Sequence, residues 1–492
     1  MRQRTPFLPG ISHHLCGRLK RSERDQLLER IERLRRDSLS RLCELFGSWL
    51  PRQLFTATPR GPNSRQRLYP VSLTFWAFLS QVLDPSSSCR EAVRKVQGWY
   101  AQQGETMPES GNGAYCQARQ RLPLKILRSA HSQLSGRLQA SPAPTGMWKG
   151  RHLRVVDGTG VSMPDTGKNR QRYSQPAGQK PGCGFPVMKL VGIFCLRTGA
   201  LLHWVQGRLE AHECRLFSRV IDFFNPGDLV VADRGFSGYG QLAALQQQRV
   251  DCLMRLHPAR KVNWRKGRKL GTRDRLVCWP RPYRQTSVFE AADWAALATE
   301  LKLRMVAIRV TVPGFRTQQL ILITTLLDPV KYPAEELGRL YLRRWAVEVF
   351  YRDIKQSMAM DILRCKSPEM IDKELLMHGM AYNLIRALMK DIAASHQIEI
   401  ERISFKGTLD ALRQWRPLFE GGARGLRVSR KRIALFYQIV AKDPLIIRPE
   451  RSEPRAVKRR PKNYRRLTKP RHEMVVERSG KRSQKPSMKA LI

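Results

Sequence analysis

Residues 152–164, HLRVVDGTGVSMP, mark the start of a sheet in this chain. The apolar, β-branched run predicts a buried strand, and Asp157 follows it directly, before a Gly-Thr-Gly turn. A second run, DLVVAD at residues 228–233, ends in the same way at Asp233, with glycine close behind. Asp next to Gly is a common turn former, so turn chemistry explains either aspartate when it is taken alone. Carried by two strand ends, the two carboxylates are expected to converge above one sheet.

Strands and helices alternate after this first strand. Residues 187–209 predict two strands joined at Arg-Thr-Gly, and residues 212–224 predict a helix. The short strand at residues 228–233 is followed by a helix at 237–248 and a strand at 251–257. This order predicts an α/β fold in which helices flank a mixed sheet.

The remaining segments differ in composition from this core. Residues 1–147 predict a basic helical domain suited to DNA contact, with helices between about residues 20 and 145. The core, residues 148–360, is interrupted by a β-rich insertion at 258–326, and residues 361–445 predict a C-terminal helical region. Residues 446–492 hold 16 Lys/Arg and 4 Asp/Glu with few large apolar side chains. That tail is predicted to be disordered until it meets nucleic acid.

Charge limits the kind of partner. The chain has 492 residues, 89 Lys plus Arg against 41 Asp plus Glu, and a formal net charge of +48, yet 42% of its residues are hydrophobic. A folded protein this basic indicates a polyanionic partner. There is no Walker A loop, no G-x-S-x-G elbow, no H-E-x-x-H and no G-x-G-x-x-G after a strand, which argues against those enzyme classes.

The cysteines and the apolar runs indicate a compartment. The ten cysteines are scattered, without a C-x-x-C pair or Cys/His zinc spacing, and predict free thiols in a reducing environment. The N-terminal residues lack a signal-peptide core, and no run approaches the ~18 apolar residues of a membrane span. We therefore expect a cytoplasmic protein with no membrane partner.

A third acid lies in residues 341–355, YLRRWAVEVFYRDIK. A helix is predicted from about residue 333 to 358, with an apolar arc on one side. At about 100° per residue, a narrow stripe on the other side carries Tyr341, Arg344, Glu348, Arg352 and Lys355. Taken alone, Glu348 is explained by helical ion pairs with its arginine neighbours, each contributing ~0.2–0.5 kcal/mol.

Three carboxylates together predict a different role. Asp157, Asp233 and Glu348 are hard oxygen donors, which divalent cations such as Mg²⁺ prefer. Two such ions ~3.5–4 Å apart can activate an attacking oxygen and stabilise the leaving oxygen of a phosphodiester. The basic side chains beside Glu348 would then hold the phosphates of nucleic acid. We expect two Mg²⁺ ions, with Mn²⁺ as a possible substitute.

These motifs resemble one class of bacterial insertion-sequence transposases with a DDE active site, the insertion-sequence 4 type. Tyr341, Arg344, Glu348 and Lys355 fit Y-x2-R-x3-E-x6-K without a gap, which is similar to the YREK motif of that class. VVDGTGVSMPDT and VVADRGFSGY resemble its first- and second-aspartate motifs. The separations of 76 and 115 residues, with a β-strand insertion in the longer one, are similar too. The resemblance covers residues 110–365 well, and RSEPRAVKRRPK is similar to a segment in one branch of the class.

The resemblance implies an RNase H-like catalytic core and cut-and-paste movement of an insertion sequence. Asp157, Asp233 and Glu348 would be the catalytic, metal-binding triad. Tyr341, Arg344 and Lys355 would contact the transposon-end DNA, and the helix stripe adds Arg352 to them. Some relatives pass through a DNA hairpin, with an aromatic residue of the insertion stacked on a flipped base. Here Trp264 and Trp279 lie in the insertion.

The expected partners are double-stranded DNA, both terminal inverted repeats and target, and a second copy of the chain in a homodimer. The expected location is the bacterial cytoplasm, associated with the nucleoid. Two other functions stay open: a catalytically idle, transposase-derived DNA-binding protein, and a nuclease that cuts without rejoining. The presence of all three carboxylates favours an active transposase over the idle protein, and a strand-transfer assay separates it from the nuclease.

Overall fold

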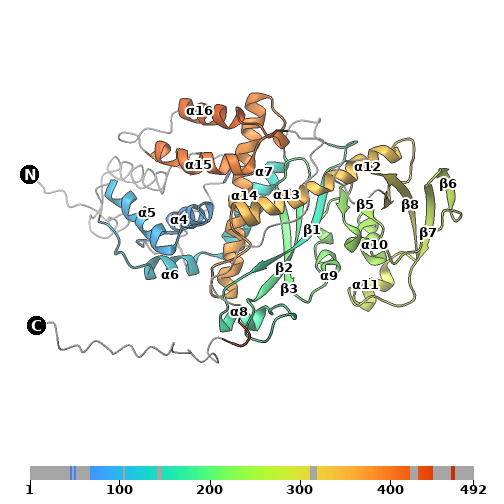
Figure 1. Cartoon of the computed structure of the whole chain (residues 1–492), viewed down its shortest axis with the longest axis horizontal. Helices are drawn as coiled ribbons and strands as arrows, with labels where there is room; N and C mark the ends of the chain where they lie inside the picture. Colours follow the sequence, from blue (N-terminus) through green and yellow to red (C-terminus); the bar gives the residue numbers. More distant parts are fainter. Residues whose placement is uncertain are drawn as a thin grey trace, which may run out of the picture.

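A computed structural model describes residues 45–46, 49–50, 67–102, 106–140, 147–310, 319–420, 430–446 and 467–470 (Figure 1). The helices predicted before residue 45 and most of the basic tail predicted at 446–492 lie outside the described residues.

Five strands form the part of the sheet that carries the first two acids. They are ordered β3-β2-β1-β4-β5, with β1 antiparallel to β2, β2 antiparallel to β3, and β1, β4 and β5 mutually parallel. This order and these directions are those of an RNase H-like core, which confirms the predicted α/β fold class. The strands are β1 (Leu153–Ser162), β2 (Val187–Cys195), β3 (Leu201–Arg208), β4 (Leu229–Ala232) and β5 (Asp251–Arg255).

The inserted strands extend this same sheet. β9 pairs antiparallel with β5, and β8, β7 and β6 follow outward, giving nine strands in all. The sequence predicted β8 and β9 but not the β6–β7 hairpin, because its residues are strongly basic and alternate poorly. These strands are β6 (Arg268–Gly271), β7 (Asp274–Pro280), β8 (Glu300–Arg309) and β9 (Gln319–Thr324). The domain boundaries stay predictions.

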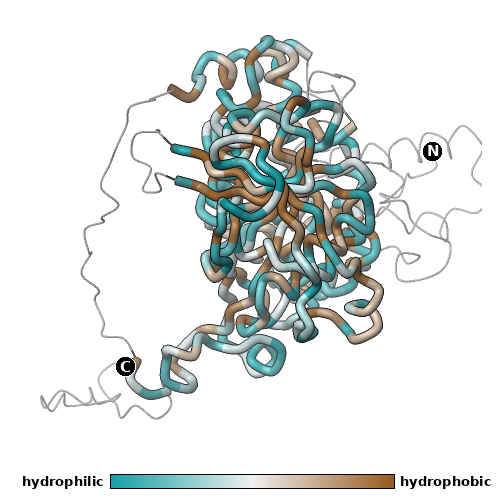
Figure 2. The backbone as a smooth tube through the Cα atoms, turned by 90° about the vertical axis from the view of Figure 1, so that its right-hand side faces the viewer, coloured by the Kyte–Doolittle hydropathy of each residue, from teal (hydrophilic) through white to brown (hydrophobic). Residues whose placement is uncertain are grey.

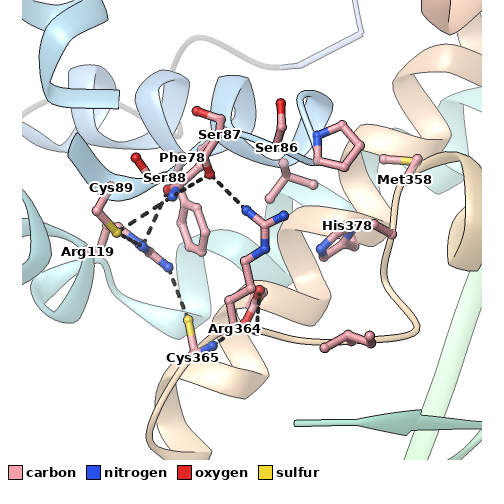
Figure 3. A pocket seen from close by; sticks show the side chains of 16 residues that line it. Phe78, Ser86, Ser87, Ser88, Cys89, Arg119, Met358, Arg364, Cys365 and His378 are labelled. Atoms are coloured by element: carbon pink, nitrogen blue, oxygen red, sulfur yellow. Dashed lines mark hydrogen bonds between the residues drawn. The ribbon is translucent and has the colours of Figure 1, made fainter. Parts of the chain in front are cut away.

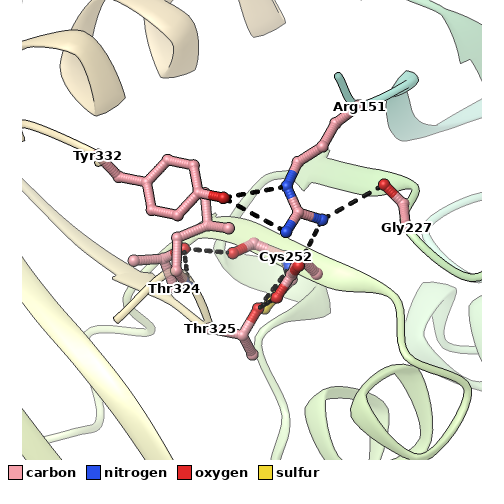
Figure 4. Close-up of polar contacts among 8 residues, drawn as sticks. Arg151, Gly227, Cys252, Thr324, Thr325 and Tyr332 are labelled. Carbon is pink, nitrogen blue, oxygen red and sulfur yellow. Dashed lines mark hydrogen bonds and ion pairs between the residues drawn. The ribbon is translucent and has the colours of Figure 1, made fainter. Parts of the chain in front are cut away.

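Polar contacts join the insertion to the core at the β5–β9 junction (Figure 4). Thr324 Oγ1 donates to the Cys252 carbonyl at 2.6 Å, and Thr325 Oγ1 donates to Asp251 Oδ1 at 2.6 Å. Arg151 reaches the same carboxylate, with its Nη1 2.5 Å from Asp251 Oδ2. Its guanidinium also donates to the Tyr332 hydroxyl at 3.4 Å. The end of the insertion is thereby fixed to the core.

Helices cover both faces of the sheet. Gly158 of β1 faces Glu213 of α9, whereas Gly192 of β2 faces Tyr351 of α13. Because Gly192 pairs with Asp157, and neighbouring residues of a strand point to opposite faces, α9 and α13 lie on opposite sides.

One long helix, α14, connects the terminal helical regions. It packs on α7 and α4 from the N-terminal region and on α15 and α16 from the C-terminal region (Figure 1). Most of its side chains are buried. The helices are α4 (Val71–Leu83), α5 (Cys89–Gln102), α6 (Gly113–Arg121), α7 (Leu124–Gln139), α8 (Gly167–Arg172), α9 (Glu213–Ser218), α10 (Tyr239–Gln247), α11 (Ala291–Ala296), α12 (Ala334–Leu342), α13 (Ala346–Arg352), α14 (Pro368–His396), α15 (Phe405–Glu420) and α16 (Arg430–Ala441).

The core follows the hydrophobic strands, which run through the interior in Figure 2. All four residues of β4 are fully buried, as expected for a central strand covered on both faces. Among the described helices, none is long and apolar enough to cross a membrane. Eight of the ten cysteines lie in the described ranges, and none of these eight forms a disulfide.

Candidate active site

Asp157 and Asp233 lie on neighbouring parallel strands. Val156 of β1 pairs with Ala232 of β4. Asp157 directly follows Val156 and Asp233 directly follows Ala232, so the register places the two aspartates next to each other. The predicted Gly-Thr-Gly turn is wrong, because β1 continues through Gly158 and Gly160 to Ser162 and stays paired with β2. The aspartates are therefore placed side by side by strand register rather than by two turns.

Gly158 is part of strand β1, where its missing side chain leaves room for Glu213. A Cβ atom at this position would lie 2.4 Å from the carboxyl of Glu213, the first residue of α9. The Glu213 carboxylate raises the pKa of Asp157, so it is an acidic neighbour of the site. Sequence reasoning missed Glu213, since nothing in its spacing links a residue of α9 to β1.

The residues of the YREK pattern lie on a helical stretch of changing pitch. α12 is followed by a 3₁₀ turn at Arg343–Trp345, by α13, and by a π-helical turn at Asp353–Ser357. The Tyr341 hydroxyl donates to Asp233 Oδ1 at 3.3 Å. Lys355 Nζ donates to Thr159 Oγ1 at 3.1 Å, two residues beyond Asp157. Both ends of the stretch thus contact the strands that carry the aspartates.

Arg344 bridges two of the predicted acids. Its Nη1 lies 3.3 Å from Asp157 Oδ2, and its Nη2 lies 3.8 Å from Glu348 Oε1. The Arg344 side chain is 6% exposed, whereas that of Glu348 is 60% exposed. Tyr341 is also fully buried. Tyr341 and Arg344 therefore contact the aspartates in this conformation, and their contact with transposon-end DNA stays a prediction.

Arg352 lies four residues after Glu348 within α13, and its predicted contact with DNA stays a prediction. It is exposed and borders a groove with Leu342, Arg343 and Asp353. Its charge acts on Asp353, whose pKa it helps to lower against the effect of burial. The uniform step of 100° per residue overlooked the 3₁₀ and π segments on either side of α13.

Trp264 and Trp279 of the insertion are both half-buried. The guanidinium of Arg260 lies 3.7 Å from the ring centroid of Trp279 and covers one face of it. The backbone carbonyl of Trp264 accepts a hydrogen bond from Arg275 Nε at 2.6 Å. Neither contact identifies a ring for base stacking, so that role stays without an assigned residue.

Burial determines the electrostatics of Asp157. Desolvation raises its pKa to about 6, opposed by the Gly158 N–H, which donates to Oδ1 at 2.8 Å, and by Arg344. The nearby carboxylates of Glu213 and Asp233 raise it further. A carboxylate in these surroundings is stabilised by an added positive charge.

The three carboxylates supply the oxygen ligands that a divalent cation prefers, but they are not gathered into a metal site in this structure. Within the described ranges, no group of three or more His, Cys, Asp or Glu side chains is arranged to hold a metal ion. Arg344 lies between Asp157 and Glu348 and supplies the positive charge there. Hard oxygen donors are nevertheless the ligands that Mg²⁺ and Mn²⁺ take. Binding by all three requires Glu348 to approach the aspartates more closely than it does here.

Tyr351, in the quoted helical stretch but outside the YREK pattern, fixes the helix to β1 and β2. Its hydroxyl donates to the Asp157 carbonyl at 2.8 Å and accepts from the Gly192 N–H at 2.9 Å. The ring is buried, and burial raises the pKa of its hydroxyl well above the ordinary value. The strand that carries Asp157 therefore has its position set partly by Tyr351.

We expect Tyr351→Phe to lower the free energy of unfolding by about 1–3 kcal/mol, because it leaves a buried N–H and a carbonyl without this partner. Denaturant unfolding followed by tryptophan fluorescence measures the change. Tyr283→Phe is the matched control, because Tyr283 is fully exposed, and it should leave the unfolding midpoint unchanged. Equal midpoints for Tyr351→Phe and wild type would show that this hydroxyl does not hold the strand.

A model of the transposase DDE domain family matches residues 148–384, which include both aspartates and the whole YREK stretch. Over these residues the chain matches the transposase DDE domain family, which confirms the predicted resemblance to transposases of the insertion-sequence 4 type.

The chain is similar to transposase InsG for insertion sequence element IS4 of Escherichia coli (strain K12). The two are 27% identical over 443 residues, which cover 87% of this chain and 95% of that relative. A solved structure of the piggyBac transposase synaptic complex with hairpin DNA matches with a TM-score of 0.39 and 7% identity, over 83% of this chain and 84% of that one.

Proposed function

We propose that this protein is a DNA transposase that excises and integrates an insertion sequence by metal-dependent phosphoryl transfer. The observation that carries the proposal is the register of β1 and β4, which places Asp157 and Asp233 side by side. Tyr341 and Arg344 of the YREK stretch contact these two carboxylates directly. The match of residues 148–384 to the transposase DDE domain family supports the same function.

In this proposal the chain's residues have separate roles. Asp157, Asp233 and Glu348 would hold Mg²⁺, with Mn²⁺ able to replace it. When bound, the metal would activate the attacking oxygen and stabilise the leaving oxygen of the phosphodiester. Tyr341 orients Asp233, while Arg344 and Lys355 place positive charge where a DNA phosphate would lie.

The proposed partners are the terminal inverted repeats of the element and target DNA, bound by a homodimer at the bacterial nucleoid. The net charge of +48 supports DNA as the partner, because phosphate contacts by Lys and Arg supply most of the affinity for nucleic acid. Excision would begin with attack by water, followed by attack of the freed 3′-OH. A hairpin intermediate is part of the proposal, without an assigned stacking residue.

A strand-transfer assay tests this function. Pre-cleaved DNA carrying the element's end is incubated with the protein, a divalent cation and a supercoiled plasmid, and joined products are separated on a gel. We expect end DNA covalently joined to the plasmid. A parallel reaction uses intact end DNA. Cleavage of the intact ends without joining of the pre-cleaved ends would instead identify a nuclease, and tight end binding with neither product would identify a DNA-binding protein.

A further inference from the structure

A cavity of about 330 Å³ lies away from the aspartates, where the N-terminal helices meet the segment after the YREK stretch (Figure 3). α4, α6 and the turn before α5 form one wall, and residues 358–365 with α14 form the other. Its polar lining includes Gln81, Ser87, Arg119, Arg364, Glu374 and His378.

Three buried polar atoms around this cavity have no hydrogen-bond partner among the described residues. They are Ser87 Oγ, Arg119 Nε and His378 Nδ1. The three residues are 1%, 7% and 6% exposed, and all three line the cavity. Buried polar atoms in folded proteins are nearly always paired. Three unpaired atoms around one cavity therefore indicate a polar ligand.

Arg119 indicates the charge of that ligand. Its Nη1 donates to Cys89 Sγ at 3.2 Å, and its Nη2 donates to Cys365 Sγ at 3.1 Å. Burial raises the pKa of the Cys365 thiol well above its usual value, which keeps that thiol neutral. The guanidinium also lies 3.9 Å from the ring centroid of Phe78. None of these hydrogen-bond partners is a carboxylate. Burial opposes the charge on Arg119, and the carboxylate of Glu374, which makes no hydrogen bond to it, favours that charge from nearby.

The carboxylate in the wall is already engaged. The oxygens of Glu374 accept the backbone N–H groups of Arg364, at 3.0 Å, and of Cys365, at 2.9 Å. Arg364 adds a second cation at the mouth, where its Nη1 donates to the Ser87 carbonyl at 2.9 Å. Burial lowers the pKa of His378 to about 3, so this imidazole is neutral at physiological pH. Two arginines and one glutamate leave the lining positively charged.

The N-terminus of α5 does not contribute to the positive charge of the cavity. The Glu91 N–H donates to Ser88 Oγ at 3.2 Å, and the Ser88 N–H donates to the Glu91 carboxylate, so the helix caps itself. The positive charge of the cavity comes from the arginine side chains.

We propose that this cavity binds a phosphate group, with Arg119 supplying the counter-charge and Ser87 and His378 supplying polar contacts. A phosphate oxygen is the strong anionic acceptor that a guanidinium pairs with best. The wall of the cavity also connects to the candidate active site. The Asp361 carbonyl accepts the N–H and the hydroxyl of Ser162, each at 3.0 Å, and Ser162 ends the strand that carries Asp157. The phosphate can belong to the backbone of bound DNA or to a free phosphate compound.

The first test is thermal unfolding of the full chain in sodium phosphate and in sodium chloride at matched ionic strength. A ligand that binds only the folded state raises the unfolding temperature by mass action. We expect phosphate to raise it for wild type and for Arg128→Gln, an exposed arginine on α7, but not for Arg119→Gln. Ser87→Ala removes a single hydroxyl and should at least halve the rise, which keeps the test informative if Arg119→Gln does not fold.

The second test identifies the source of the phosphate. The affinity for a DNA duplex is measured against salt concentration for the same four proteins. Loss of one backbone contact should reduce the slope of log K against log salt by about 0.9 in Arg119→Gln but not in Arg128→Gln. If phosphate does not raise the unfolding temperature of Arg119→Gln and the slope of log K against log salt is unchanged, the cavity binds a free phosphate compound. Wild-type thermal response and wild-type slope in both Arg119→Gln and Ser87→Ala would overturn the proposal.

Discussion

Asp233→Asn and Asp157→Asn should each reduce cleavage of the element's end by about 10³-fold or more, the scale expected when a group that stabilises transition-state charge is lost. Asparagine preserves the shape of the side chain but removes the negative charge that a divalent cation requires. The strand register that positions both residues does not depend on that charge. Binding of the end DNA should therefore stay close to wild type.

The control for these variants is Asp165→Asn. Asp165 follows Asp157 in the same sequence motif, but it is exposed and pairs with Arg170 at 3.4 Å. This change should leave the single-turnover cleavage rate within about twofold, as expected for a surface pair. Single-turnover rates measured with saturating protein give the comparison for all three variants. Cleavage by Asp233→Asn at the wild-type rate would remove this residue from the reaction.

Arg304→Met should lower the free energy of unfolding by about 3–5 kcal/mol, because it leaves a buried carboxylate without its counter-charge. Arg304 of β8 is 1% exposed, and its Nε and Nη2 lie 2.9 and 2.5 Å from the two carboxylate oxygens of Asp274 in β7. Its Nη1 donates to the Tyr332 carbonyl at 2.6 Å, just before α12. The side chain thus ties the inserted strands to the start of the YREK stretch.

Two further variants show whether the lost stability comes from leaving the Asp274 carboxylate without its counter-charge. Arg304→Met combined with Asp274→Leu should recover much of the lost stability, since an apolar pair can replace a buried ion pair at little cost. Arg339→Met removes an exposed ion pair to Glu335 and should cost under about 1 kcal/mol. The denaturant midpoints of wild type, Arg304→Met, the double variant and Arg339→Met test both expectations. A single variant Arg304→Met as stable as Arg339→Met would contradict the assigned role.

The sequence predicted the elements of the sheet well, because short β-branched runs such as DLVVAD carry a local signal. It did not predict how the sheet continues. Pairing of β9 with β5 brings together residues about 70 positions apart, and no local pattern encodes it. The hairpin at residues 268–280 was missed because its many basic side chains obscure the alternation of polar and apolar residues that is expected of a strand. Gly158 was misassigned because an Asp-Gly pair looks the same in the sequence whether it lies in a strand or in a turn.

Helical periodicity predicted which residues of the YREK stretch lie near the aspartates. Tyr341, Arg344 and Lys355 each contact the strands that bear the aspartates or their side chains, as a common face of the helix requires. Arg352 borders a groove beside this stretch, and its contact with DNA stays a prediction. Glu213 and the double contact of Tyr351 were missed because both depend on tertiary packing.

The most direct test of the central claim is the metal dependence of cleavage by the wild-type protein. End-labelled DNA carrying the element's own terminus is incubated with the protein in Mg²⁺, in Mn²⁺ or in excess chelator, and the strands are separated on a denaturing gel. The account predicts a nick at the terminus with either ion and none with chelator. A nick that persists in chelator, or tight binding of the terminus without a nick in either ion, would contradict it.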